Sequence, residues 1–344
     1  MKAMRFAHYG GPEVMILEEL PALEPGPGEV VVEVHACALN HVDLDIRSGV
    51  SRLPVPLPHT LGLEFAGVVS EAGSEVDASW IGQRVTALHQ VHCGKCQWCL
   101  RGEEESCSDT RLFGVHIAGG YATHVLVPER ALIRIPDSLS FDDAAASQTT
   151  FSTAWHALRS RANLLPGETV LVNAAGSGVG VAAIQLAQLL GGRVIVSAGS
   201  DDKMNAALEM GAVGGVNYRT SDLASGVLEL TDGRGVDVVM ESVGGNVLKG
   251  GLEALAQNGR LVTVGAHAGE VVPVDVIVLF RKQLSLLGSV RANKAEIEHV
   301  LTLVGAGSVK PRIHRRFPLS GAREAHAVLA ERSNLGKVIL DPTH

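Results

Sequence analysis

The sequence predicts an α/β protein with two domains, one rich in β-strands and the other a doubly wound parallel sheet. Its length of 344 residues corresponds to about two domains. Residues 1–151 contain mostly short alternating apolar runs separated by Pro and Gly, which indicates a β-rich, barrel-like domain. Between residues 152 and 290 strand and helix patterns alternate, which indicates a parallel sheet covered by helices.

The tail of the chain completes the first domain. From residue 291 the sequence predicts a long helix, a short strand at 312–317, another helix and a last strand at 337–340. We assign residues 291–344 to the β-rich domain. Residues 152–290 then form the second domain, with helices expected at 181–190, 202–210 and 247–257 and strands at 194–197, 236–240 and 261–264.

A glycine-rich turn follows the first strand of the second domain. The β-prone run at 170–172 leads into Gly176, Gly178 and Gly180, and an apolar helical pattern follows at once. This order of strand, glycine turn and helix suits a dinucleotide, because the glycines permit a tight turn, close approach of a pyrophosphate and close helix packing. Ser177 and Val179 complete the predicted cofactor turn. An ordinary glycine-rich turn is the alternative.

Four cysteines lie close together in the first domain. Cys93, Cys96 and Cys99 are spaced by three residues, and Cys107 follows eight residues later. Four thiolates on one short loop can complete a tetrahedral shell around Zn²⁺ and leave no position for substrate. The spacing therefore predicts one structural zinc in a lobe at about 90–108. An iron–sulfur cluster and four unrelated thiols are the alternatives.

The composition and net charge argue against several classes of binding partner. The net charge of −8 argues against nucleic acid or an anionic membrane as a partner, and no apolar run is long enough to span a bilayer. The chain opens without a recognisable export signal, and five cysteines in such a chain indicate metal ligands or free thiols rather than disulfides. We expect a soluble cytoplasmic protein that acts on a small molecule.

The glycine turn and the four-cysteine loop together resemble the medium-chain dehydrogenase/reductase superfamily, which includes zinc alcohol dehydrogenases and quinone oxidoreductases. The resemblance extends to segments 61–69, 151–155 and 336–340. It implies a GroES-like catalytic domain, a Rossmann domain and a nicotinamide cofactor held between them, with cofactor contacts expected at Thr153 and Gly265. It also implies a homodimer through the edge of the Rossmann sheet, at strands near 271–276 and 284–290. The apolar run 276–280 suits either an interface or a core.

The chain departs from the zinc alcohol dehydrogenases at the ligands of their catalytic zinc. Where those enzymes have a cysteine, a histidine and a third ligand, this chain has Asn40, Leu63 and Thr149. Leucine cannot ligate a metal, and neutral Asn and Thr oxygens are poor zinc ligands. Val42 replaces the hydroxyl of the expected proton relay. We therefore expect that no catalytic zinc is bound.

The stretch from Asn40 through Asp43 to Arg47-Ser48-Gly49 looks like the zinc-independent quinone oxidoreductases. The resemblance implies hydride transfer to a quinone or an α,β-unsaturated carbonyl, which hydrogen bonds can activate without a Lewis acid. Asn40 is the first candidate catalytic group, with Thr149 in support and Asp43 orienting them. The alternatives are a zinc-dependent alcohol dehydrogenase with atypical ligands and a nucleotide-binding protein with little catalysis.

The predicted cofactor is NADP(H) rather than NAD(H). The strand after the glycine turn ends without the acidic residue that binds the ribose of NAD. Ser200 and Lys203 instead offer a hydroxyl and a cation to a 2′-phosphate, and the resemblance implies a third contact at Tyr218, which matches a tyrosine near the adenosine phosphate in NADPH-dependent relatives. Asp201 and Asp202 oppose this assignment, unless they only form the first turn of the next helix.

Overall fold

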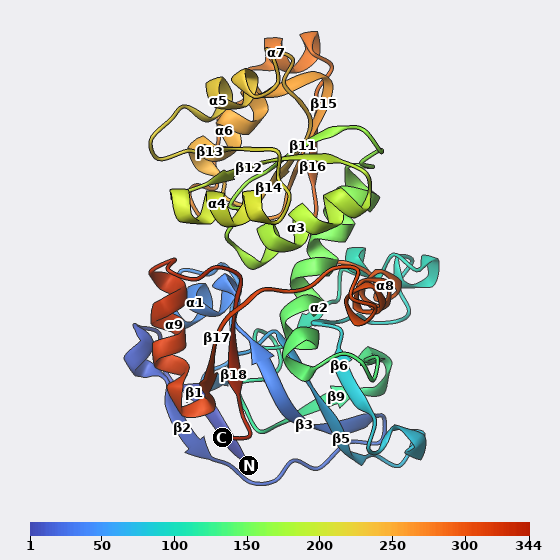
Figure 1. Cartoon of the computed structure of the whole chain (residues 1–344). Coiled ribbons are helices and arrows are strands. Elements are labelled where there is room, and N and C mark those ends of the chain that lie inside the picture. The colour runs from blue at the N-terminus through green and yellow to red at the C-terminus, as the bar shows by residue number, and fades with distance from the viewer. The chain divides into compact units, whose positions relative to one another are not determined.

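The computed structural model describes residues 1–344, and the chain divides into two compact units (Figure 1). Unit 1 contains residues 1–149 and 293–344, and unit 2 contains residues 150–292. Both chain crossings therefore lie close to residues 151 and 291, where the sequence places the domain limits. The first crossing falls inside helix α2 (Phe141–Trp155), which continues into a π-helical segment, η6 (His156–Arg161).

Unit 1 is the β-rich, GroES-like unit. Its largest sheet has the order β10-β6-β5-β3-β18-β17, with β9 also paired to β3, and two smaller sheets have the orders β2-β1-β4 and β7-β8. The strands are β1 (Lys2–Phe6), β2 (Ile16–Glu19), β3 (Glu29–Ala38), β4 (His59–Thr60), β5 (Glu64–Ala72), β6 (Arg84–Ala87), β7 (Gln90–Val91), β8 (Arg111–Leu112), β9 (His124–Pro128), β10 (Leu132–Arg134), β17 (Ile313–Pro318) and β18 (Lys337–Asp341).

The long strand β3 organises unit 1, since it pairs with β5, β9 and β18. Its apolar residues are almost all buried, and their burial favours folding by roughly 25 cal/mol per Å² of apolar surface. The antiparallel register sets Ile339 of β18 opposite Ala38 of β3. This pairing brings the start of the C-terminal strand beside Asn40, nearly 300 residues earlier in the chain.

Short helices fill the connections of unit 1. They are η1 (Pro12–Val14), α1 (His41–Ser48), η2 (Ala78–Trp80), η3 (Cys99–Arg101), η4 (Glu104–Ser106), η5 (Glu129–Ala131), α8 (Lys294–Gly305), η7 (Leu319–Gly321) and α9 (Ala322–Ala330). Helix α1 begins directly after Asn40, and the Asp43 carboxylate accepts the Asn40 backbone N–H at 2.8 Å. Negative charge in the first turn favours the helix and fixes the point where β3 ends.

Unit 2 is a parallel sheet of six strands in the order β13-β12-β11-β14-β15-β16, the order of a Rossmann domain (Figure 1). Its strands are β11 (Thr169–Val172), β12 (Arg193–Ala198), β13 (Gly214–Asn217), β14 (Val236–Glu241), β15 (Leu255–Thr263) and β16 (Ser285–Gly288). Its helices are α3 (Gly178–Leu189), α4 (Asp201–Glu209), α5 (Leu223–Glu229), α6 (Gly245–Glu253) and α7 (Val276–Arg281). Strand β11 is fully buried, and β12 and β14 each have a single residue that is not, as expected of a parallel sheet covered by helices.

Two expectations for unit 2 are wrong. Residues 271–276 form no strand, because Pro273 interrupts the run and Asp275 caps helix α7 by accepting the Ile277 and Val278 N–H groups. The helix expected over 247–257 ends at Glu253, since Leu255 pairs with Val236 and starts β15. Strand β13 and helix α5 were not predicted, because each is short and rich in small residues.

Candidate active site and structural metal centre

The four cysteines of the lobe converge on one point in unit 1. Their sulfur atoms all lie within 4.8 Å of one another, with Cys93 and Cys99 3.9 Å apart and Cys96 and Cys99 3.5 Å apart. Four thiolates around one zinc at about 2.3 Å would lie roughly 3.8 Å apart, so the donor set fits a tetrahedral ion. The Cys93 N–H donates to the Cys107 sulfur and the Cys96 N–H to the Cys93 sulfur, each at 3.4 Å. These N–H donors suit thiolates.

The glycine turn of unit 2 has the form that a dinucleotide requires. Ser177 is the N-cap of α3, and its hydroxyl accepts the Gly180 N–H at 2.9 Å. A Cβ at Gly180 would lie 2.3 Å from the carbonyl oxygen of Ala174, so no side chain fits there. Gly178 and Val179 form the first turn of α3, whose remaining N–H groups can bind an anion.

Lys203 reaches the glycine turn from helix α4. A Cβ at Gly176 would lie 2.6 Å from the Cδ of Lys203, so the lysine stem crosses the turn at that glycine. Ser200 is the N-cap of α4 but makes no side-chain cap bond. Asp201 and Asp202 form the first turn, and Asp201 accepts the Asn217 side-chain N–H at 2.8 Å. The position of both acids in the first turn of α4 therefore explains their presence without a contact to the cofactor.

Tyr218 lies beside Gly199, one residue before Ser200. A Cβ at Gly199 would lie 2.9 Å from the Tyr218 hydroxyl and 3.2 Å from the Nε of Arg219. Arg219 was not predicted. Its position directly after Tyr218, where strand β13 ends beside β12, could have identified it in the sequence. Arg219 brings a second cation to this edge of the sheet.

The other two expected cofactor residues lie elsewhere in unit 2. Thr153 is partly buried in α2. Gly265 lies in the loop after β15, and its carbonyl accepts the Thr263 hydroxyl at 3.2 Å. A Cβ at Gly265 would lie 3.1 Å from the carbonyl oxygen of Ser242. The loops after β14 and β15 therefore pack closely at this glycine.

In unit 1 two of the three predicted catalytic residues, Asn40 and Thr149, meet at a buried carboxylate. Glu64 is fully buried at the start of β5; it accepts the Asn40 side-chain N–H at 3.1 Å and the Thr149 backbone N–H at 2.7 Å. The Thr149 hydroxyl donates to the Gln148 side chain at 2.8 Å. Glu64 therefore links Asn40 and Thr149, which are far apart in the sequence.

Lys337 is the member of this cluster that sequence reasoning missed. Its ammonium forms a salt bridge with Glu64 and donates to the Asn40 side-chain oxygen at 2.9 Å and to the Leu39 carbonyl at 2.6 Å. Its side chain is only 6% exposed. The signal was a lysine opening an otherwise apolar strand, because buried lysines need an anionic partner. Lys337 holds the carboxamide of Asn40 in one orientation.

Asp43 lies at the end of a second buried chain of hydrogen bonds. Arg47 donates to His326 Nδ1 at 3.1 Å, which requires His326 Nε2 to carry the proton that bonds the Tyr121 oxygen at 3.0 Å. The Tyr121 hydroxyl then donates to Asp43 at 3.3 Å. Burial raises the pKa of Asp43 to about 6 and lowers the pKa of His326 to about 3.

Comparisons with known proteins agree with this architecture. Residues 26–137 match the family described as Alcohol dehydrogenase GroES-like domain, and residues 178–306 match the one described as Zinc-binding dehydrogenase. The chain is 34% identical to a quinone oxidoreductase of Pseudomonas aeruginosa, with 99% of each chain covered.

The chain belongs to the medium-chain dehydrogenase/reductase superfamily. It is therefore an NAD(P)H-dependent oxidoreductase. It is also 30% identical to an NAD-dependent alcohol dehydrogenase of Sulfurisphaera tokodaii, over 99% of this chain and all of that one. A solved structure titled as an NAD-dependent alcohol dehydrogenase superposes with a TM-score of 0.93 at 41% identity, and 99% of each chain is covered.

The catalytic zinc of the superfamily's alcohol dehydrogenases does not fit this chain. The four cysteines are the one group of three or more His, Cys, Asp or Glu side chains that converges on a point. At the positions of the catalytic ligands, Leu63 is buried and apolar, and Asn40 already binds Lys337 and Glu64. A leucine offers no donor atom, and neutral amide and hydroxyl oxygens are poor zinc ligands, so these residues do not fit that ion.

Two histidines of unit 1, His59 and His116, are not charged acids at neutral pH. Burial lowers the pKa of both His59 and His116, so both rings are neutral at pH 7. His116 Nδ1 accepts the Leu112 N–H at 3.0 Å. Neither ring is therefore positioned as a charged proton donor.

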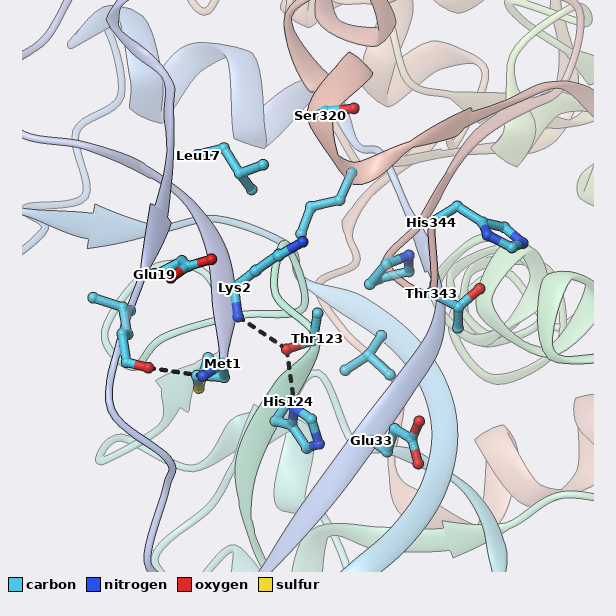
Figure 2. A pocket seen from close by; sticks show the side chains of 14 residues that line it. Met1, Lys2, Leu17, Glu19, Glu33, Thr123, His124, Ser320, Thr343 and His344 are labelled. Atoms are coloured by element: carbon cyan, nitrogen blue, oxygen red, sulfur yellow. Dashed lines mark hydrogen bonds between the residues drawn. The ribbon is translucent and has the colours of Figure 1, made fainter.

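Figure 2 shows a cavity of about 730 Å³ that is separate from these residues. It lies where β1, β2, β3 and β9 meet the C-terminal residues, and charged side chains such as Lys2, Glu19 and Glu33 line it. None of the predicted catalytic, cofactor or metal residues lines this cavity.

No helix in the structure combines the length and the apolar character needed to cross a bilayer.

Proposed function

We propose that this superfamily member uses NADPH to reduce a quinone or an α,β-unsaturated carbonyl compound without a catalytic metal. The observation that carries the proposal is the cluster around Asn40, where a buried Lys337–Glu64 pair binds the Asn40 carboxamide at a position that zinc alcohol dehydrogenases use for a metal ligand. A bound reduced nicotinamide supplies the hydride. Quinones and enones are the substrates that need only hydrogen bonds to the developing oxyanion.

Asn40 is the group that would make that hydrogen bond. Its side-chain oxygen accepts from Lys337, and one of its N–H groups donates to Glu64 at 3.1 Å. The other amide hydrogen has only a weak 3.4 Å contact with the Ala38 carbonyl, so it is the donor available to a substrate oxygen. Lys337 and Glu64 fix the carboxamide in advance, so little reorganisation is needed when charge develops.

Steady-state turnover with NADPH against a panel of quinones, enones and simple ketones tests this proposal. We expect reduction of the quinones or enones, and a loss of roughly 100-fold in kcat for Asn40→Ala, the usual cost of one oxyanion donor. Ser70→Ala is the control, since Ser70 lies on the same strand β5 as Glu64 but its hydroxyl donates to the Val31 carbonyl at 3.2 Å, away from the cluster. Oxidation of simple alcohols with NAD would instead favour an alcohol dehydrogenase with atypical ligands.

We infer a preference for NADPH from Ser200, Lys203, Tyr218 and Arg219. The Ser200 hydroxyl, which makes no capping bond, lies at the end of β12 together with the Tyr218 phenol and two cations. Charge-assisted hydrogen bonds from these groups would favour a 2′-phosphate there. The relatives named as NAD-dependent keep NADH as the second candidate. Dissociation constants for NADPH and NADH separate the two, and we expect Arg219→Ala to weaken NADPH binding while leaving NADH binding nearly unchanged. Equal affinity of the wild type for both cofactors would contradict the preference.

We infer one structural zinc per chain, held by Cys93, Cys96, Cys99 and Cys107. Such a four-thiolate site fits a reducing compartment, which favours the cytoplasm. Metal analysis of the purified protein distinguishes one zinc per chain from the two of an alcohol dehydrogenase. Two zinc ions, or iron with acid-labile sulfide, would contradict this assignment.

We infer a homodimer through the edge of the Rossmann sheet. Strand β16 is an edge strand, and helix α7 buries none of its residues within the chain. Val276, Ile277 and Phe280 are each more than half exposed, and an apolar surface of this kind favours association. Light scattering should give the mass of a dimer, and Phe280→Asp should shift it to a monomer. A wild-type monomer at micromolar concentration would contradict the inference.

A further inference from the structure

Glu241 is a buried carboxylate in unit 2 that neither the predicted site nor the proposed chemistry uses. It ends β14, a central strand of the parallel sheet, and its side chain is fully buried. Neighbouring strands β11 and β12 end beside it, where parallel sheets bind nucleotides. Burying a carboxylate is costly unless hydrogen bonds compensate, so its partners indicate why it is there.

Donors surround the Glu241 carboxylate. One oxygen accepts the backbone N–H groups of Val243 and Gly244, the second of these at 2.8 Å. The other oxygen accepts the Asn173 side-chain N–H at 2.5 Å, and the Asn173 oxygen accepts the Ser197 hydroxyl at 2.6 Å. Asn173 directly follows β11 and Ser197 belongs to β12. The carboxylate therefore connects the ends of three adjacent strands.

The backbone at Glu241 extends the connection to a fourth strand. The Glu241 carbonyl accepts the Val264 N–H at 2.9 Å, and the Val243 carbonyl accepts the Ala268 N–H at 2.7 Å. Both donors belong to the loop after β15, which includes Gly265. The Glu241 side chain therefore joins the residue before the glycine turn to the turn after β14, and the backbone of Glu241 and Val243 joins these to the loop after β15.

The polarity of this network is fixed. Both carboxylate oxygens receive only N–H donors in these bonds, and Asn173 must turn its nitrogen to Glu241 because its oxygen faces the Ser197 hydroxyl. Burial raises the pKa of Glu241, and the N–H donors oppose that rise. The geometry has no place for a second carboxylate at Asn173.

We propose that Glu241, acting through Asn173, is a positioning residue that sets the cofactor-binding loops at the carboxyl edge of the sheet. Neither side chain reaches the surface, so neither touches the dinucleotide itself. The proposal rests on the proposed binding of a nicotinamide dinucleotide by the glycine turn. Loss of the network should therefore raise the dissociation constant of the cofactor, while the cofactor-free protein still folds.

Exchange of the two groups tests the network. Asn173→Asp sets two carboxylates against each other, and we expect the dissociation constant of NADPH to rise at least about tenfold, because the two carboxylate oxygens that face each other then lack a donor. The double variant Glu241→Gln with Asn173→Asp restores one amide and one carboxylate at the same contact. We expect it to return the dissociation constant to within about threefold of wild type, as complementary partners cost little when both are changed.

Asp237→Asn is the matched control. Asp237 belongs to the same strand but lies near its amino end, where its carboxylate accepts the Thr169 N–H of β11 at 2.8 Å. It also joins β14 to β11, so its loss should lower the melting temperature of the cofactor-free protein. We expect the dissociation constant of NADPH to stay near the wild-type value, since the carboxyl edge is untouched.

Titration of wild type and variants with NADPH and NADH, together with melting temperatures without cofactor, gives distinct outcomes. A network that acts on cofactor binding predicts weak binding by Asn173→Asp, rescue by the double variant and unchanged binding by Asp237→Asn. Wild-type affinity in Asn173→Asp, or equal losses in both single variants, would overturn the role of Glu241 alone. A wild-type protein that binds neither dinucleotide would overturn the proposed function instead.

Discussion

The cysteine lobe and the cluster around Asn40 are both built from polar side chains of unit 1, but they are assembled in different ways. All four thiolates lie between residues 93 and 107, so one short loop brings them together. The Asn40 cluster instead draws Glu64, Thr149 and Lys337 from three distant parts of the chain. Local spacing creates the first site, and the register of β18 on β3 creates the second.

This difference sets what each site depends on. The lobe contains little hydrophobic core of its own, so the proposed zinc would be the main contribution to its order. The Asn40 cluster is held by the paired strands of unit 1 and depends on balanced charge, because a buried ion that loses its partner is strongly destabilising. Removing zinc should therefore act locally, and removing one buried charge should destabilise the whole unit.

The largest expected effect is loss of the lobe when zinc is removed. Structural zinc binding by four ligands is worth on the order of 10 kcal/mol, so Cys96→Ser or a strong chelator should unfold residues 90–108. Limited proteolysis should then cut within that segment, and metal analysis should show no zinc. Cys37→Ala is the control, since this buried cysteine lies outside the lobe and its variant should keep one zinc. A lobe that resists proteolysis without metal would contradict the comparison.

The next effect is at Lys337. Lys337→Met leaves Glu64 buried without its cation, and we expect a loss of about 3–5 kcal/mol in the free energy of unfolding by urea. The double variant Lys337→Met with Glu64→Gln removes both charges and should recover much of that loss. Equal stability of Lys337→Met and wild type would show that the pair contributes nothing.

A smaller, pH-dependent effect is expected at Asp43. Its pKa in the folded protein is about 6, above the 3.8 of the unfolded chain, so the folded state holds this proton more tightly. The contribution of Asp43 to stability is therefore fully present below pH 3.8 and is lost as pH rises through about 6, a change of about 3 kcal/mol. The difference in unfolding free energy between wild type and Asp43→Asn should change by this amount across the window.

His326 provides the control of opposite sign. Its folded pKa of about 3 lies below the unfolded value of 6.5, so its contribution to stability rises as pH increases from 3 to 6.5. His326→Gln should remove that rise while leaving the Asp43 fall in place. Parallel pH profiles for wild type and Asp43→Asn would contradict the raised pKa of Asp43.

The same contrast explains how much of the molecule could be predicted from its sequence. The fold class and the cysteine centre follow from residues close together in the chain, and the structure and the comparisons bear them out. Lys337 and Arg219 were missed because their partners are set by strand pairing, which one sequence does not reveal. The prediction of a strand at 271–276 was wrong because it followed the apolar run, although Pro273 disfavours a strand and Asp275 caps a helix.

The smallest effect compares two serines at helix starts in unit 2. Ser177 accepts the Gly180 N–H, so Ser177→Ala should cost about 1 kcal/mol of unfolding free energy, the usual value of a lost N-cap. Ser200 starts α4 without such a bond, so Ser200→Ala should leave stability nearly unchanged. If Ser200 instead serves the cofactor, its variant should weaken NADPH binding relative to NADH binding. Equal stability losses in both variants would show that Ser200 is a structural cap after all.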